Sequence, residues 1–267
     1  MYYYRTYKML KTLDLFSGIG GFAVGLEATN FFKTTCFVEQ EPYCKEVLRH
    51  HFPEVPILGD IKNVKRSDLP DPDPDVILGG FPCQPFSSAG LQKAQSDSRH
   101  LFPEMFRLIK ECRPSWVIGE NVIGIVKLGL DEVLTDLESE GYATRTFNIP
   151  ACAVGAPHLR QRVWIVAHNV ADPQSERHGR GSSEKCGNEQ RIILPKEQGG
   201  SKMGSEAEGC GEPHRPEQWW ESEPPVGRLA HGVSHRVSQI RALGNSIIPQ
   251  IAKEIGNAIK TAETTQP

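Results

Sequence analysis

Two prolines frame a cysteine in the segment Pro82-Cys83-Gln84-Pro85, which follows a short apolar run and two glycines. Prolines stiffen a loop, and a loop at the end of a buried strand presents its side chains to ligands. A cysteine inside an apolar core is inert, whereas a thiol held at such an edge can act as a nucleophile when its surroundings favour the thiolate. These features make Cys83 a candidate nucleophile.

A glutamate and two arginines lie next to other apolar runs. Glu120 ends one such run and is followed by Asn121, while Arg160 and Arg162 stand at alternate positions just before another run. Alternate residues of an extended chain point to the same side, so the two guanidiniums can face one ligand. A surface carboxylate and a solvated basic face are the alternative interpretations. A cysteine site nearby favours the functional interpretation of all three groups.

The sequence from Leu13 to Phe22 passes from an apolar stretch into a glycine-rich turn and then into a helical pattern. Such a turn lets backbone amides approach a ligand at the carboxyl edge of a doubly wound sheet, although it also serves tight strand-to-helix packing. Glu39 ends the next apolar stretch, where a carboxylate can accept hydrogen bonds from both ribose hydroxyls. Asp60 ends the third and can accept a hydrogen bond from an adenine amino group. We therefore expect an adenosine-containing ligand, and this pattern alone leaves open a nicotinamide cofactor or S-adenosylmethionine.

The elements that must position these residues alternate between short apolar runs and amphipathic stretches of helical length. Helices are expected at 101–112 and 130–140, and an isoleucine-rich stripe predicts a further helix over 248–259. This alternation predicts an α/β fold with a doubly wound, mostly parallel sheet that carries helices on both faces. The expected strands are 12–16, 34–39, 55–59, 75–80, 115–120, 144–149 and 162–168.

Length and composition exclude several classes of protein. The 267 residues fit one large domain or one domain with a small appendage, and 38% of them are hydrophobic and 24% charged. No apolar run can cross a bilayer and residues 1–11 do not resemble a secretory leader, so we expect a cytoplasmic protein with no membrane association. Seven cysteines without C-x-x-C spacing argue against a disulfide framework. We expect no bound metal, because the spacing of Cys186, Cys210 and His214 is irregular.

Residues 168–235 differ in character from the rest of the chain. They contain 10 of the 25 glycines and show no clear periodicity, which predicts a loop-rich insert or small subdomain. They hold eight basic and eleven acidic residues, whereas the rest of the chain holds 22 of each, so the net charge of −3 lies in the insert. A polyanionic partner would therefore have to bind a local basic surface around Arg99, Arg160 and Arg162, together with a few arginines of the insert.

In their order along the chain, these motifs resemble the DNA cytosine-5 methyltransferases, in the compact form of prokaryotes or phages. The resemblance rests on the glycine-rich turn, the acidic strand ends, the Pro82-Cys83-Gln84 loop, Glu120-Asn121-Val122, the Arg160-x-Arg162 pair and Gly244-Asn245-Ser246. It implies the Rossmann-like fold of S-adenosylmethionine-dependent methyltransferases. The catalytic and cofactor-binding core would occupy 1–167 and a small loop-rich target-recognition insert 168–235. Within 236–267, a C-terminal helix would return to the core and pack beside the first strand.

The resemblance also implies a role for individual residues. The catalytic residues would be Cys83, Glu120 and Arg162, and further contacts to the DNA substrate would come from Ser87, Arg99, Asn121 and Arg160. The residues that would bind S-adenosylmethionine, the methyl donor, are Phe16, Gly18, Ile19, Gly20, Glu39, Asp60, Ile61, Pro82, Leu101, Asn245 and Ser246.

The implied reaction explains why these residue types are needed. The target cytosine must be flipped out of double-stranded DNA, because its reacting carbons are stacked inside the duplex. Addition of the Cys83 thiolate to carbon 6 makes carbon 5 nucleophilic enough to take the methyl group. Glu120 would engage ring nitrogen 3 and the exocyclic amine, and Arg162 would bind the oxygen on carbon 2.

We expect a monomer that acts on DNA in a restriction-modification or phage setting, where a cognate restriction endonuclease would act separately.

Two features depart from the family's usual pattern, and other functions are compatible with parts of the sequence. His158 stands where a glutamine commonly precedes the two arginines, and the stretch before the last helix is shortened. An RNA-directed relative would use the same thiol chemistry, although duplex DNA explains a sizeable base-reading insert more easily. A non-catalytic adenosine-binding or nucleic-acid-binding protein would leave Cys83, Glu120 and Arg162 without a reason to converge. Nothing identified in the sequence would orient the nicotinamide ring of a dehydrogenase.

Overall fold

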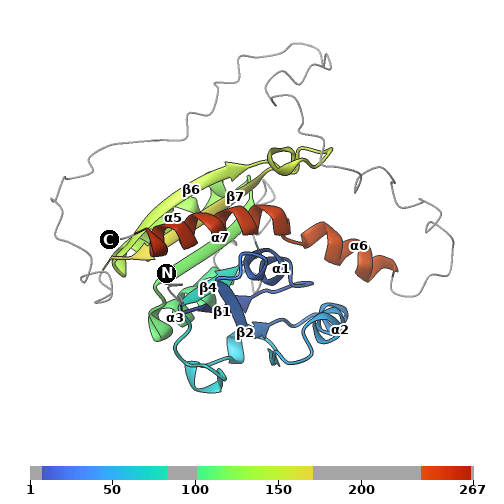
Figure 1. The fold of residues 1–267 in the computed structure, drawn as a ribbon, viewed down its shortest axis with the longest axis horizontal. Helices are drawn as coiled ribbons and strands as arrows, with labels where there is room; N and C mark the ends of the chain where they lie inside the picture. The colour runs from blue at the N-terminus through green and yellow to red at the C-terminus, as the bar shows by residue number, and fades with distance from the viewer. Residues whose placement is uncertain (1–7, 83–100, 171–235, 266–267) are drawn as a thin grey trace, which may run out of the picture.

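The computed structural model describes residues 8–82, 101–170 and 236–265, and seven strands within these ranges form one sheet (Figure 1). The strands are β1 (Leu10–Leu15), β2 (Phe32–Val38), β3 (Ile57–Leu58), β4 (Val76–Gly79), β5 (Trp116–Val122), β6 (Tyr142–Ile149) and β7 (Arg162–Asn169). Their order across the sheet is β3-β2-β1-β4-β5-β7-β6. Neighbouring strands are parallel except at β7, which runs antiparallel to both β5 and β6. The predicted fold class, a doubly wound and mostly parallel sheet, is confirmed.

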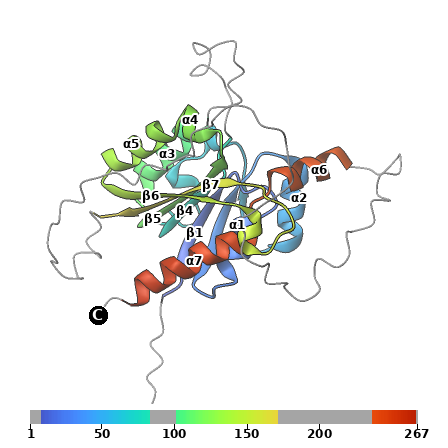
Figure 2. The same cartoon turned by 90° about the horizontal axis from the view of Figure 1, so that it is seen from above.

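Helices cover both faces of this sheet (Figure 2). They are α1 (Gly21–Glu27), α2 (Pro42–His51), α3 (Phe102–Cys112), α4 (Ile125–Leu128), α5 (Leu130–Ser139), α6 (Arg236–Asn245) and α7 (Pro249–Thr264), with short 3-10 turns at Ile61–Asn63, Arg66–Asp68 and Ala151–Val154. One core cluster joins α3 and α5 to the sheet, and another joins α1 and α7 to its opposite face. The predicted apolar stripes are buried, as Met105 on α3 and Ile251 on α7 show. Among the described helices, none is both long and apolar enough to cross a bilayer.

Glycines allow α1 and α7 to approach closely, although the two helices lie far apart in the sequence. A Cβ atom on Gly25 would lie 2.2 Å from the carbonyl oxygen of Pro249, and one on Gly256 would lie 2.8 Å from a methyl group of Leu26. The backbone oxygen cannot move away from Gly25, so only hydrogen fits there, whereas a Cβ atom on Gly256 would require the Leu26 side chain to shift. This packing fixes the start of α7, and with it the segment that joins α6 to α7, at one edge of the sheet.

Three details differ from the expected elements. Strand β3 has only two residues, since it lies at the sheet edge and pairs with β2 alone. Helix α6 has no counterpart among the predicted elements, because its sequence carries no apolar stripe and Ile240 and Leu243 are exposed. Asn245 therefore ends α6, whereas the sequence places it at the opening of the last helix.

Candidate active site

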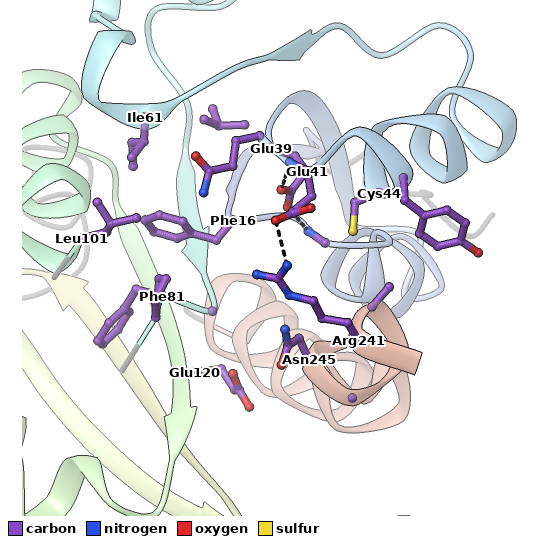
Figure 3. A pocket seen from close by; sticks show the side chains of 18 of the residues that line it. Phe16, Glu39, Glu41, Cys44, Ile61, Phe81, Leu101, Glu120, Arg241 and Asn245 are labelled. Atoms are coloured by element: carbon purple, nitrogen blue, oxygen red, sulfur yellow. Dashed lines mark hydrogen bonds and ion pairs between the residues drawn. The ribbon is translucent and has the colours of Figure 1, made fainter. Parts of the chain in front are cut away.

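A cavity of about 440 Å³ opens at the carboxyl edge of the sheet, beside the adjacent ends of β1 and β4 (Figure 3). The strand order reverses between these two strands, and sheets of this kind bind their ligands at such a reversal. The predicted site residues that line the cavity are Phe16, Gly18, Glu39, Asp60, Ile61, Pro82, Leu101, Glu120, Asn121, Arg162 and Asn245. Residues expected to bind the cofactor and residues expected to bind the target base thus share one cavity.

The turn after β1 is held in an unusual backbone conformation. Phe16 has a φ of 55°, in the left-handed region that residues other than glycine rarely adopt. Gly18 and Gly20 follow with φ of 56° and 85°, and a Cβ atom on Gly20 would lie 2.9 Å from the Phe52 ring. The hydroxyl of Ser17 donates a hydrogen bond of 2.6 Å to the carbonyl of Asp14 and anchors the turn. Local strain of this kind is typical of binding sites, and here it brings Phe16 and Gly18 to the cavity wall.

Glu39 lies just past the end of β2 and is only 8% exposed. One of its carboxylate oxygens accepts a hydrogen bond of 2.7 Å from the amide of Gly18, and the other accepts one of 2.8 Å from the amide of Glu41. These two bonds fix the carboxylate relative to the glycine-rich turn. Each oxygen of a carboxylate has room for a second hydrogen bond, so Glu39 can still bind two hydroxyl groups of a ligand.

Asp60 and two apolar side chains form the neighbouring wall. A carboxylate oxygen of Asp60 accepts a hydrogen bond of 3.0 Å from the amide of Lys62 and caps the turn at 61–63. The side chains of Ile61 and Leu101 are buried next to it, and Figure 3 shows Phe16 on the same side of the cavity. The fixed carboxylate of Glu39 can bind a ribose, and this apolar wall can bind an adenine. Together they fit an adenosine-containing cofactor such as S-adenosylmethionine.

Glu120 and Arg162 form a buried ion pair in the other half of the cavity. Nε of Arg162 lies 2.9 Å from Oε1 of Glu120, and the two side chains are 18% and 11% exposed, respectively. Burial raises the pKa of the Glu120 carboxyl to about 7, and the nearby charges of Arg162 and Arg160 offset only part of that rise. Glu120 can therefore both hold and release a proton near neutral pH, which is the property of a group that donates a hydrogen bond to a ring nitrogen.

Two further predicted residues act on the protein itself in this structure. The side-chain amide of Asn121 donates a hydrogen bond of 2.9 Å to the carbonyl of Phe81 and so braces the segment that follows β4. Nη2 of Arg160 donates to the carbonyls of Gly244 and Ser246, at 2.7 and 3.0 Å. Arg160 thereby ties the start of β7 to the junction of α6 and α7, and we expect it to position that junction.

Some cavity residues carry no signal in the sequence. Arg241 on α6 reaches Glu41 at the start of α2, and their nearest charged atoms are 3.3 Å apart (Figure 3). Cys44 of α2 also lines the cavity, and burial raises the pKa of its thiol to about 11. The position of Glu41 just after Glu39 is the one clue to this wall that the sequence offers.

Other predicted residues lie elsewhere. Ile19, Gly20 and Ser246 do not line the cavity, and Gly20 instead caps the start of α1. Cys83, Ser87 and Arg99 lie outside the described residues, as do residues 171–235 of the insert predicted at 168–235. The first two residues of that predicted insert, His168 and Asn169, are the last two residues of β7. Within the described ranges, no group of three or more histidine, cysteine, aspartate or glutamate side chains could hold a metal ion.

Residues 10–202 match the family model of the C-5 cytosine-specific DNA methylases. The chain belongs to this family. Type II methyltransferase M.NgoBI from Neisseria gonorrhoeae is 37% identical over 166 residues, which cover 59% of this chain and 50% of the relative. Type II methyltransferase M.AquIA from Picosynechococcus sp. is 31% identical over 180 residues, which cover 60% and 72% of the two chains.

Solved structures of methylases share the fold. A crystal structure of a Spodoptera frugiperda DNMT2 variant superposes with a TM-score of 0.53 at 24% identity, over 60% of this chain and 50% of the other. The chain spans about half the length of the curated relatives it matches first, with 50% and 41% of their residues covered. The family match over residues 10–202 thus covers most of this chain.

Proposed function

We propose that the protein is a DNA (cytosine-5)-methyltransferase that takes its methyl group from S-adenosylmethionine. The observation that carries this proposal is one cavity with two chemically distinct halves. One half offers the fixed carboxylate of Glu39 beside apolar walls, and the other offers the buried pair of Glu120 and Arg162. Pro82 lines the same cavity and is followed in the sequence by Cys83, the proposed nucleophile.

The chain's own residues would divide the work as follows. Glu39 would bind the ribose, and Asp60, Ile61 and Leu101 would surround the adenine. When bound, S-adenosylmethionine supplies an electrophilic methyl group on sulfur. The Cys83 thiolate would bond to carbon 6 of a flipped cytosine, which moves electron density onto carbon 5, and it would leave again when a base removes the proton from carbon 5.

Glu120 and Arg162 would bind the target base during this attack. The protonated carboxyl of Glu120 would donate a hydrogen bond to ring nitrogen 3 and stabilise the negative charge that the thiolate pushes into the ring. Arg162 would donate to the oxygen on carbon 2. Because Glu120 also accepts a hydrogen bond from the exocyclic amine, the pair would favour cytosine over thymine.

Double-stranded DNA is the proposed partner, and residues 168–235 are the proposed target-recognition insert. We further propose that the protein is a monomer and acts in the cytoplasm. It would serve either a restriction-modification system with a separate cognate endonuclease or phage-associated DNA methylation. Support for this setting comes from the curated relatives, which are named as type II methyltransferases of bacteria.

The proposed insert can be tested by exchange. Replacing residues 168–235 with the corresponding segment of a methyltransferase of known specificity should redirect methylation to that enzyme's site, because base contacts determine sequence choice. Bisulfite sequencing of plasmid DNA incubated with each protein would read the result. An active chimera that still methylates the original site would assign recognition to another part of the chain.

Transfer of labelled methyl groups tests the function as a whole. We expect the protein to label plasmid DNA when it is given S-adenosylmethionine with a radioactive methyl group, and bisulfite sequencing should place the product at cytosines. Total RNA serves as the competing substrate. Label in RNA alone would favour the RNA-directed alternative, while label on adenine, or on neither polymer, would exclude the proposed reaction.

A further inference from the structure

Arg107 lies on α3, outside the cavity, yet its guanidinium reaches a turn that lines it. Nη2 donates hydrogen bonds to the carbonyls of Ile61 and Val64, at 3.0 and 2.8 Å. These carbonyls belong to the 3-10 turn at Ile61–Asn63 and to the residue that caps it. Asp60 and Ile61, at the front of this turn, form part of the cavity wall.

Two glutamates on the same helix hold the guanidinium in place. Nε of Arg107 lies 2.9 Å from Glu104, and Nη1 lies 2.9 Å from Glu111. Glu111 in addition accepts a hydrogen bond of 3.2 Å from the amide of Arg66, at the next turn of the same connection. The guanidinium therefore makes four hydrogen bonds in a fixed plane, and the three protons of a lysine ammonium on its flexible stem cannot reproduce this arrangement.

The position of α3 gives these contacts a consequence for the cavity. Leu101, which precedes α3, lines the cavity, and Met105 on its first turns packs against Gly79 at the end of β4. Arg107 joins this helix to the turn that carries Asp60. The wall proposed to hold the adenine is thus assembled from two segments, 60–64 and 101–107, and Arg107 is a direct polar link between them.

We propose that Arg107 is a positioning residue for cofactor binding, which holds the turn at 60–64 so that Asp60 and Ile61 face the adenine. This inference rests on the proposed function, because the adenine belongs to the proposed cofactor. Loss of the guanidinium loosens the wall of the binding site without removing any group that contacts the reacting atoms.

Arg107→Gln is the test variant, and Arg113→Gln is its matched control. Arg113 caps the C-terminal end of the same helix, and its Nη1 lies 2.7 Å from Oε2 of Glu140. The Arg113 side chain does not line the cavity. For Arg107→Gln we expect Kd and KM for S-adenosylmethionine to rise about tenfold, as the loss of charged hydrogen bonds predicts, with kcat at saturating cofactor within about twofold. Arg107→Lys should recover only part of this affinity, and Arg113→Gln should leave Kd unchanged.

Hydrogen exchange of the protein without cofactor gives a second, independent measurement. The amides of Lys62, Asn63 and Val64 are hydrogen-bonded within the turn and should exchange at least about tenfold faster in Arg107→Gln than in Arg113→Gln. If Arg107→Gln fails to fold, Glu104→Gln and Glu111→Gln, which loosen the guanidinium, should show smaller changes in the same direction.

The outcomes separate this inference from the proposed function. If the unchanged protein binds no S-adenosylmethionine, the proposed function fails. Faster hydrogen exchange at 62–64 in Arg107→Gln would still show that Arg107 holds the turn at 60–64. If the protein binds the cofactor and Arg107→Gln lowers thermal stability without changing either Kd or exchange at 62–64, Arg107 is merely structural and the inference is wrong.

Discussion

Cys83→Ala should abolish methyl transfer, with a loss of turnover on the order of 10⁴-fold or more, because it removes the only group proposed to bond to the cytosine ring. Cofactor binding should stay within a few fold, since the groups proposed to bind adenosine belong to other segments. Transfer of labelled methyl groups to plasmid DNA measures the first effect, and calorimetric titration with S-adenosylmethionine measures the second.

Three other thiols, all within the described part of the chain, are poor candidates for this role. Cys44 lines the cavity, but burial raises the pKa of its thiol to about 11, so it is protonated near neutral pH. Burial raises the pKa of Cys36 and Cys112 to about 11 as well. A thiolate is the attacking form, so these three cysteines lack the activation that a nucleophile requires.

Cys152→Ala is the control for the loss of a thiol as such. Cys152 lies in the 3-10 turn before β7 and does not line the cavity, so turnover should stay within about twofold of that of the unchanged protein. Near-normal turnover of Cys83→Ala would remove the nucleophile assignment. Loss of cofactor binding in Cys83→Ala would instead place Cys83 among the groups that shape the cavity.

The sequence could predict that the acidic site residues lie close together, because the carboxyl ends of parallel strands meet at one edge of the sheet. Glu39, Asp60 and Glu120 each follow an apolar run, and the structure brings all three to the same cavity. The stripe over 248–259 likewise predicted α7, whose isoleucines pack on the sheet. In both cases the pattern is local in sequence, so propensity and periodicity are sufficient.

The parts that could not be predicted depend on contacts between distant segments. Helix α6 has no apolar stripe, and it is held by contacts such as that of Arg241 with Glu41 and that of Arg160 with Gly244. The two partners of each contact are many tens of residues apart, so no spacing rule connects them. Tertiary contacts here override a weak local preference, which is the usual limit of reading helices from sequence.

Two glycines within helices indicate close packing, but they do not identify the packing partner. Gly25 and Gly256 interrupt otherwise ordinary helical patterns, and the structure explains them as points where α1 and α7 touch. A glycine within a helix costs about 1 kcal/mol relative to alanine, so its presence suggests close approach of another backbone or side chain. The sequence does not say which element approaches.

Glu120→Gln should lower kcat on the order of 10²- to 10³-fold, because a glutamine cannot supply the acidic proton that stabilises charge on the ring. It should also change the pH profile. The pKa of Glu120 is about 7, so the protonated carboxyl is lost as the pH rises above that value and kcat/KM for DNA should fall. In Glu120→Gln this fall should disappear, whereas Glu132→Gln, which removes an exposed carboxylate on α5, should keep it.

The pH dependence of the unfolding free energy tests the raised pKa of Glu120 without an activity assay. Burial raises the pKa of Glu120 from its ordinary 4.5 to about 7, so the folded protein binds this proton more tightly than the unfolded protein does. The contribution to folding is fully present below pH 4.5 and is lost as the pH rises through about 7, which amounts to roughly 3 kcal/mol. The unchanged protein loses this contribution between pH 5 and pH 8, whereas Glu120→Gln does not. The unfolding free energy of Glu120→Gln, measured with urea, should therefore rise relative to that of the unchanged protein over this range. A constant difference over this range would mean that Glu120 is already ionised at pH 5, and the proposed proton donor would have to be another group.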